Sequence, residues 1–198
     1  MRRISLDRFA DEHNVDAATL VELGSAVRGG IWPREASVLV GLLKFIRPDN
    51  TFEFGTYRGD TTRLLARNFA GTVYTLDLDS IEGVSFAPAT PDRVLAEEAT
   101  AAHRDYAGLD IVQLLGDSYR FDPTPYEGKM GFVFIDGNHD LKYLRRDTAN
   151  ALRMAASRSV IVWHDYGYPE HPKLTAYLDS LGEELCHVEG THLVYRLR

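Results

Sequence analysis

The sequence predicts a single α/β domain built on a doubly wound, mostly parallel sheet. Strand-like runs alternate with helical ones after residue 50, which is typical of a parallel sheet covered by helices on both faces. The apolar runs 133–135 and 160–163 fit strands that are buried on both sides. A chain of 198 residues is most simply one domain, which buries roughly 70% of the surface of the unfolded chain.

The elements follow in order from these patterns. Strands are expected at Thr51–Gly55, Thr72–Asp77, Asp110–Leu115, Gly131–Asp136 and Ser159–His164. Helices are expected at Pro33–Ile46, Thr61–Asn68, Pro91–Tyr106, Leu141–Ala156 and Lys173–Gly182. Leu185–Glu189 and His192–Leu197 flank Gly190-Thr191, which predicts an antiparallel hairpin.

Two segments remain outside this alternation. Residues 1–32 precede the first strand, and we expect them to form helices that cap the ligand crevice of the core, residues 33–198. Ser80–Thr90 is rich in glycine, proline and serine, so it is either a mobile loop or a lid.

Composition excludes several classes of protein. The net charge of −7 argues against a nucleic-acid partner bound through its phosphates. The single cysteine, Cys186, excludes an internal disulfide and a cysteine-rich zinc site. No apolar run approaches the about 20 residues that span a bilayer, and the N-terminus lacks the hydrophobic core of a signal peptide. A cytoplasmic location and no membrane partner are therefore expected.

The most informative stretch joins the first predicted strand to a helix. It reads Glu53-x-Gly55-x-x-x-Gly59, and the two glycines let the backbone approach a ligand closely. The following helix directs its free N–H groups toward the same place, which suits a carboxylate or phosphate. Glu53 adds the opposite sign, so a ligand with both an ammonium and a carboxylate fits. The alternative is a strand–helix turn that binds nothing.

This motif resembles motif I of class I S-adenosylmethionine-dependent methyltransferases. It has neither the three glycines of a dinucleotide fingerprint nor the ending of a P-loop. The resemblance implies a Rossmann-like sheet that ends in an antiparallel hairpin. It also implies that the loop, with Glu53, Gly55, Thr56 and Gly59, holds the methionine part of S-adenosyl-L-methionine, with the acid near the amino group.

Two further positions match cofactor contacts. Asp77 lies 22 residues after Gly55 at the end of the second strand, where an acid can bind a ribose hydroxyl pair; a solvated strand end or helix cap is the alternative. Asp117 and Ser118 follow the third strand and resemble the adenine-contacting motif of the family, with Asp117 at the exocyclic amine. A local turn would use the same residue types.

Acidic residues and histidines follow the fourth and fifth strands, in the strings FVFIDGNHD and SVIVWHDY. Adjacent strands lie about 4.8 Å apart, so Asp136 and Asp165 are expected to reach one ion between them. Two close carboxylates repel each other unless a cation or proton intervenes. Oxygen ligands with at most one imidazole, that of His164, suit Mg²⁺ or Mn²⁺. His139 lies three residues beyond Asp136, at the same rim, and is a candidate proton acceptor.

Each of these residues also has a structural interpretation. Asp136 can cap a loop, His139 can bond to backbone, and His164 and Asp165 can form a local pair. Their joint position at two neighbouring strand ends favours a shared site.

The strings IDGNHD and WHDY resemble the small metal-dependent sugar and macrolide O-methyltransferases, some of whose relatives are grouped with cephalosporin hydroxylases. The resemblance covers roughly residues 33–167 and implies that Asp136 and Asp165 bind the metal, that Asp136 also borders the cofactor, and that His139 is the general base. His164 departs from the pattern, because several members have a second carboxylate there.

The sequence therefore predicts an S-adenosylmethionine-dependent methyltransferase that acts on a hydroxyl of a small molecule with help from a divalent metal. An NAD-dependent oxidoreductase and an inactive cofactor-binding relative are the alternatives. Oligomeric state stays open, and a homodimer is compatible with the sequence. His171 and His192 read as surface or loop residues, and Trp32 and Trp163 as core or crevice wall.

Overall fold

The computed structural model describes residues 1–15, 30–86, 92–102 and 104–198. One sheet contains the strands β1 (Arg2–Ile4), β2 (Asn50–Phe54), β3 (Thr72–Asp77), β4 (Ile111–Leu115), β5 (Met130–Ile135), β6 (Ala155–Trp163), β7 (Cys186–Val188) and β8 (Val194–Leu197). The α-helices are α1 (Leu6–His13), α3 (Pro33–Ile46), α4 (Asp60–Arg67), α5 (Asp92–Ala101), α6 (Leu141–Met154) and α7 (Pro172–Ser180). Two short 3₁₀ helices are η1 (Ser118–Arg120) and η2 (Thr124–Tyr126).

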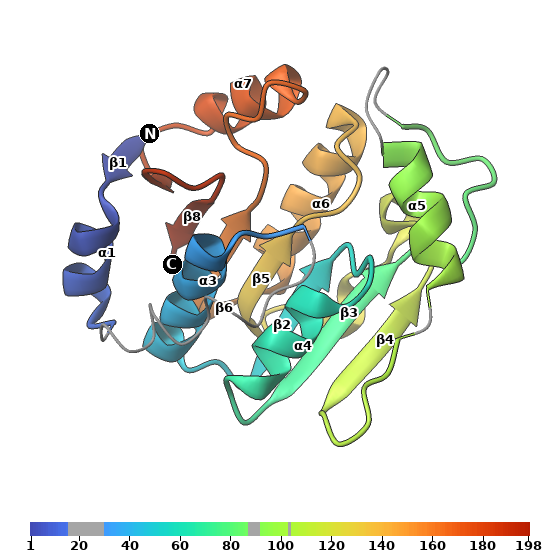
Figure 1. Ribbon diagram of the computed structural model, residues 1–198, viewed down its shortest axis with the longest axis horizontal. Helices are drawn as coiled ribbons and strands as arrows, with labels where there is room; N and C mark the ends of the chain where they lie inside the picture. Colours follow the sequence, from blue (N-terminus) through green and yellow to red (C-terminus); the bar gives the residue numbers. More distant parts are fainter. Residues whose placement is uncertain (16–29, 87–91, 103) are drawn as a thin grey trace.

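The strand order is β1-β7-β8-β6-β5-β2-β3-β4 (Figure 1). The strands from β2 to β6 are parallel to one another, whereas β8 runs antiparallel to both β6 and β7. From β2 the chain adds β3 and β4 on one side and later β5 and β6 on the other. This confirms the doubly wound sheet with a terminal antiparallel hairpin, and it places the ligand-binding switch point beside β2 and β5.

Side chains of the central strands alternate between two cores, one on each face of the sheet. In β5, Phe132 and Phe134 pack in one cluster with α1, α3 and α4, whereas Val133 and Ile135 pack in the other with α6 and α7. Every residue of β5 is buried. The apolar runs in the sequence reflect this burial on both faces.

The predicted bounds hold best for elements with long patterns. The predicted helix Pro33–Ile46 and strand Thr72–Asp77 match α3 and β3. The helix expected to extend to Tyr106 ends at Ala101, and β6 begins at Ala155 because α6 runs into it without a loop. Part of the expected mobile loop or lid, residues 87–90, lies outside the described residues.

The first residues do not form the expected helical cap. β1 adds to the edge of the sheet, parallel to β7, with Arg2 opposite Cys186. The ring Nε2 of His13, at the end of α1, lies 2.8 Å from the hydroxyl of Tyr195 in β8. Helix α1 therefore covers the first core rather than the crevice. A strand of three residues is too short for its pattern to be recognised, and residues 16–29 lie outside the described part of the chain.

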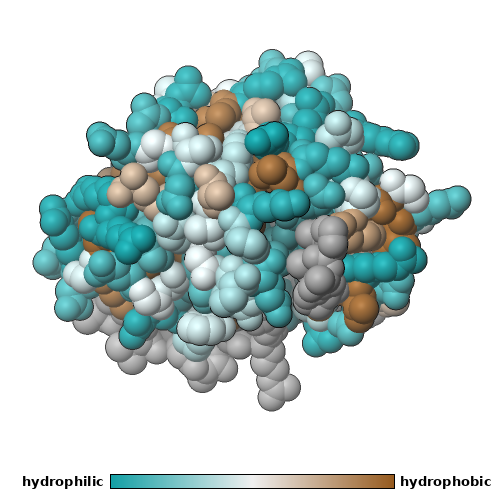
Figure 2. All heavy atoms as spheres, turned by 90° about the horizontal axis from the view of Figure 1, so that it is seen from above, coloured by the Kyte–Doolittle hydropathy of each residue, from teal (hydrophilic) through white to brown (hydrophobic). Residues whose placement is uncertain are grey.

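The surface is that of a polar globular domain. On the face seen from above in Figure 2, the described residues are mainly hydrophilic, and hydrophobic side chains form small separate groups. In the described part of the chain, every helix is too short or too polar to cross a membrane.

The loop after β2 touches the loop after β5 at Gly55. Gly55 has a φ of +92°, and a Cβ at this position would lie 2.1 Å from the carbonyl oxygen of Asp136. The N–H of Asp136 donates to the carbonyl of Phe54 over 2.9 Å and fastens the two loops. Only glycine fits such an approach. The predicted glycine motif is therefore also what brings Asp136 beside that loop.

Glu53 supports the glycine loop from below. It is fully buried, and its Oε2 accepts hydrogen bonds from the hydroxyls of Thr62 (2.5 Å) and Thr75 (2.6 Å). Burial raises the pKa of Glu53 to about 8, because it outweighs the two hydroxyl bonds that lower it. The side chain therefore carries a proton near neutral pH, which suits a structural role beneath the loop.

We expect Gly55→Ala to lower the free energy of unfolding by about 3 kcal/mol, because the new Cβ meets the Asp136 backbone. Gly182→Ala is the matched control: its φ is +91°, but nothing lies within 4 Å of its Cβ position. That variant should lose only about 1 kcal/mol through backbone strain. Urea denaturation followed by circular dichroism measures both values. Equal losses would show that the contact with Asp136 is unimportant.

The raised pKa of Glu53 also predicts a pH dependence of stability. Between the ordinary value of 4.5 and the folded value of about 8, the folded state holds a proton that the unfolded state has released. Stability should therefore fall as pH rises through this range. Glu53→Gln keeps the shape but cannot titrate, so its stability should fall less steeply. Parallel stability curves of the two proteins, measured by urea denaturation from about pH 5 to pH 8, would contradict the shift.

Candidate functional site

A cavity of about 470 Å³ opens at the carboxyl ends of the parallel strands. Its walls come from the loops after β2 to β6, from one side of α5 and from the segment before α7. This is the edge at which doubly wound sheets bind their ligands. The volume lies within the usual range for small-molecule sites.

Two cavity residues hold a left-handed backbone conformation without being glycine. They are Tyr57, with a φ of +48°, and Asp165, with a φ of +60°. Among the described residues, Asn14 and Arg47 also have a positive φ, but these end α1 and α3, where the conformation is an ordinary helix cap. Strain away from a helix end is typical of ligand-binding loops.

The predicted cofactor residues separate into two groups. Those that line the cavity are Gly55, Asp77, Ser118 and Asp136. Those that do not line it are Glu53, Thr56, Gly59 and Asp117.

The second group has structural contacts instead. Thr56 lies 2.7 Å, hydroxyl to hydroxyl, from Thr75 in the network around Glu53. Gly59 begins α4, and a Cβ there would lie 2.7 Å from the hydroxyl of Tyr106. Asp117 accepts a hydrogen bond from the N–H of Tyr119 and caps η1. The spacing of the motifs assigned these residues to the loops around the cavity, but it did not show which side chains face the cavity.

Asp77 lies at the end of β3 and is tied to the glycine loop by an arginine that the sequence did not single out. Arg104 donates to Oδ2 of Asp77 over 2.5 Å and to the carbonyl of Tyr57 over 2.7 Å. The other carboxylate oxygen of Asp77 accepts from the N–H of Leu78 at 2.9 Å. The acid is thus fixed at the cavity wall before any ligand enters.

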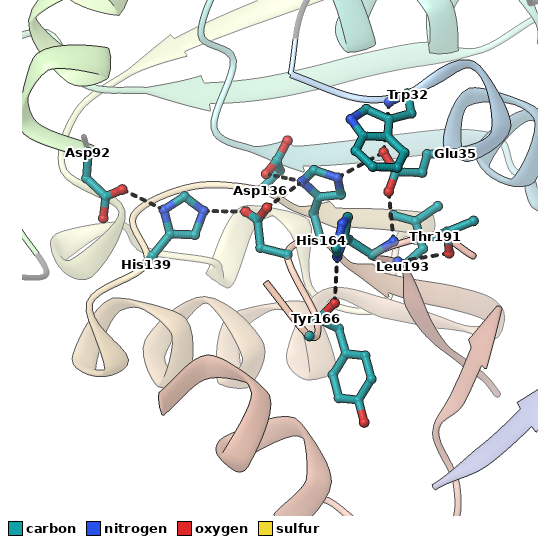
Figure 3. Close-up of polar contacts among 12 residues, drawn as sticks. Trp32, Glu35, Asp92, Asp136, His139, His164, Tyr166, Thr191 and Leu193 are labelled. Atoms are coloured by element: carbon teal, nitrogen blue, oxygen red, sulfur yellow. Dashed lines mark hydrogen bonds and ion pairs between the residues drawn. The ribbon is translucent and has the colours of Figure 1, made fainter. Parts of the chain in front are cut away.

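The residues after β5 and β6 form a chain of alternating carboxylates and imidazoles (Figure 3). Nε2 of His139 lies 2.6 Å from Oδ2 of Asp165. Nδ1 of His164 lies 3.0 Å from Oδ1 of Asp136 and 3.4 Å from Oδ1 of Asp165. The structure therefore brings together all four residues that the sequence placed at these two strand ends.

Two acids that the sequence analysis did not single out extend this row of acids and imidazoles, one at each end. Nδ1 of His139 lies 2.9 Å from Oδ1 of Asp92, the first residue of α5. Nε2 of His164 lies 3.3 Å from Oε2 of Glu35, in the first turn of α3. In sequence both acids look like ordinary residues of a helix start. Their burial, with Glu35 only 1% exposed, is the signal that the sequence lacks.

The carboxylates set the charge of the two histidines. Burial disfavours the charged imidazole, but hydrogen bonds to Asp165 and Asp92 prevail and raise the pKa of His139 to about 10. The pKa of His164 is likewise raised by Asp136 and Asp165, against the effect of burial. Burial would raise the pKa of Asp165, but the charge of His164 lowers it well below its ordinary value. The carboxylates therefore favour the protonated form of both imidazoles.

Three side chains in this row of acids and imidazoles could hold a cation. Asp136, His139 and Asp165 offer ligand atoms that lie within 4.8 Å of one another. His164, the predicted third ligand, does not belong to this group, although its Nδ1 lies 3.0 Å from Oδ1 of Asp136 and 3.4 Å from Oδ1 of Asp165. A donor set of two carboxylates and one imidazole suits Mn²⁺ or Mg²⁺.

His171, predicted to be a surface or loop residue, lies in the loop before α7 but is not on the surface. It is buried and stacks on His139, with ring centroids 4.1 Å apart and an interplanar angle of 23°. His192 is half-buried, and its N–H donates to Oε1 of Glu35 over 2.8 Å. Trp32 is 56% exposed rather than in the core or the cavity wall, whereas Trp163 is a core residue.

Comparisons with known proteins agree with this architecture. A sequence profile of the family described as a methyltransferase domain matches residues 52–166. No curated protein matches the chain. The matched segment runs from β2 to the loop after β6 and contains the glycine loop and the chain of acids and histidines.

Several solved structures share the fold. TomG, an O-methyltransferase from Streptomyces achromogenes involved in tomaymycin synthesis and solved in complex with SAM, is 17% identical, with a TM-score of 0.53 over 97% of this chain and 88% of its own. Cofactor-bound Rv0187 from MTB is 20% identical, with a TM-score of 0.56 over 97% and 95%. An O-methyltransferase from Bacillus cereus in complex with SAH is 16% identical, with a TM-score of 0.51 over 98% and 90%.

At these identities the solved structures establish the fold, and the family follows from the sequence profile. The profile covers more than half of the chain, including the part that forms the cavity. The chain therefore belongs to the methyltransferase-domain family.

Proposed function

We propose that this methyltransferase transfers the methyl group of S-adenosylmethionine to a hydroxyl oxygen of a small molecule, with help from a divalent cation. The observation that carries the proposal is the convergence of Asp136, His139 and Asp165 in the same cavity as the glycine loop. Neighbouring structures solved with SAM or SAH support this choice of methyl donor. The nicotinamide alternative is not favoured, because the matching family is one of methyltransferases.

The cavity residues fit the three parts of such a donor. The backbone at Gly55 leaves room for the methionine part, and Asp77 is an acceptor for ribose hydroxyls. Ser118 is a polar contact for the adenine edge, and Leu78 offers an apolar contact. When bound, S-adenosylmethionine supplies an electrophilic methyl group. The residues' task is to align it with the acceptor, which is worth roughly 7–11 kcal/mol.

Asp136 and Asp165 would hold the cation. Their carboxylates now face His164 and His139, so a cation would exchange places with these hydrogen bonds. A bound divalent cation supplies positive charge that lowers the pKa of a hydroxyl beside it. Asp165 is positioned for this by its strained backbone at the end of β6.

His139 is the group best placed to take the proton of the hydroxyl. Asp92 holds its Nδ1 at 2.9 Å, so Nε2 would be the nitrogen that accepts the proton. The arrangement of acid and imidazole orients the ring in the way that hydrolytic triads do.

The remaining expectations belong to the same proposal. The partner is a small-molecule acceptor, and no nucleic acid or membrane is involved. We propose a cytoplasmic location and leave the homodimer as a matter for measurement.

The metal role predicts that Asp136→Asn will abolish the part of the turnover that depends on Mg²⁺ or Mn²⁺. Affinity for S-adenosylhomocysteine should change by less than about threefold, because one neutral amide replaces a carboxylate of equal size. Calorimetric titrations with S-adenosylhomocysteine and with Mn²⁺ separate the two effects. Asp11→Asn, at an exposed position on α1, is the control. Loss of both affinities in a folded variant would contradict the role.

The base role predicts that His139→Gln will lower kcat by about 10²- to 10⁴-fold. The affinity for S-adenosylhomocysteine should remain within about twofold of the parent value, because proton removal is a separate task from donor binding. Single-turnover kinetics and calorimetry measure the two quantities. An unchanged kcat would assign the proton to another group, and a wild-type protein without any methyl transfer would favour an inactive cofactor-binding relative.

A further inference from the structure

The acceptor end of the cavity carries an excess of negative charge. Asp92, Asp136, Asp165 and Glu170 line it, and Glu35 lies behind His164. When the imidazoles of His139 and His164 are both protonated and a divalent cation is bound, the positive charges at this end add up to four. They do not balance the five negative charges of these acids. The surplus field favours a positively charged molecule over a negatively charged one.

The arginines near the cavity do not offset this surplus. Among the described residues that line it, the permanent cation is Arg58, whose guanidinium lies 3.2 Å from the carboxylate of Glu98. Arg104 is bound to Asp77. Both arginines are thus paired with acids outside the acceptor end, and the described lining residues include no lysine, so an anionic acceptor finds no unpaired arginine or lysine there.

The segment between β6 and α7 adds aromatic surface to the same end. Tyr168 lines the cavity and is 37% exposed, and its ring lies 5.9 Å from His171 and 5.0 Å from His192, centroid to centroid. Glu170, which is exposed, follows two residues later and also lines the cavity. Tyr168 and Glu170 thus bring an aromatic ring and a carboxylate to the lining of the same cavity, and both kinds of group attract ammonium ions.

We propose that the methyl acceptor is a hydroxylated amine, whose protonated amino group is bound at Tyr168 and Glu170 while its hydroxyl lies at His139. Catecholamines and amino sugars share this chemistry. The inference rests on the proposed function, because it concerns the acceptor of that reaction. Acceptors that carry a carboxylate or phosphate are disfavoured by the same field.

Isothermal titration calorimetry tests this with related probes of different charge. The protein, with S-adenosylhomocysteine and Mg²⁺ present, is titrated with dopamine, catechol and 3,4-dihydroxybenzoate, and separately with glucosamine and glucose. The amine should bind about tenfold or more tighter than its acidic counterpart in the first series, or than its neutral counterpart in the second. The difference should shrink as salt is added. The two series distinguish an aromatic from a sugar acceptor.

Two variants test the place of the amine. Glu170→Gln should weaken binding of the preferred amine by about threefold and leave the neutral probe unchanged, as expected for an exposed charge pair. Tyr168→Leu should also weaken the amine more than the neutral probe. Glu183→Gln, at an exposed position after α7, is the matched control and should change neither.

Equal or tighter binding of the dihydroxybenzoate, or no binding of either amine at millimolar concentration, would overturn the inference. So would an amine preference that Glu170→Gln leaves intact. Binding is measured without turnover, so these outcomes are separate from the proposed function. That function fails instead if the protein binds no S-adenosylhomocysteine, and the same probe comparison can then be made without it.

Discussion

Half-buried carboxylates at the ends of neighbouring strands impose the main constraint on this molecule. Asp136 and Asp165 follow β5 and β6, and adjacent parallel strands force their side chains together. Buried charges are tolerated only when they are paired. His139 and His164 supply that pairing, and Asp92 and Glu35 fix the far side of each ring. The same arrangement provides the group of side chains to which we assign a metal ion in the proposed function.

The chain of acids and imidazoles also joins parts of the fold that are far apart in sequence. Glu35 holds the start of α3, accepts the N–H of His192 before β8 and contacts His164 after β6. Asp92 adds α5 through His139. Helices on the outside of the sheet therefore orient the imidazoles of the site, which explains why buried acids occur at the starts of two helices.

Periodicity and spacing were sufficient for the sheet, for most helices and for the strand ends that carry Asp136, His139, His164 and Asp165. These features depend on local pattern and on the geometry of parallel strands. Asp92, Glu35 and His171 escaped because their importance depends on how helices and loops dock, which one sequence does not encode locally. Glu53 shows another limit of motif spacing: this motif residue is buried beneath the loop and does not line the cavity.

The contact between Gly55 and the Asp136 carbonyl has an evolutionary consequence. The glycine loop and the loop that carries Asp136 meet at a distance where no side chain fits, so neither loop can change its position without the other. Sequence changes that create new acceptor preferences are therefore expected in the helices and in the segment before α7, away from this junction. Descendants of such a chain would diversify their substrates while inheriting the junction as a single unit.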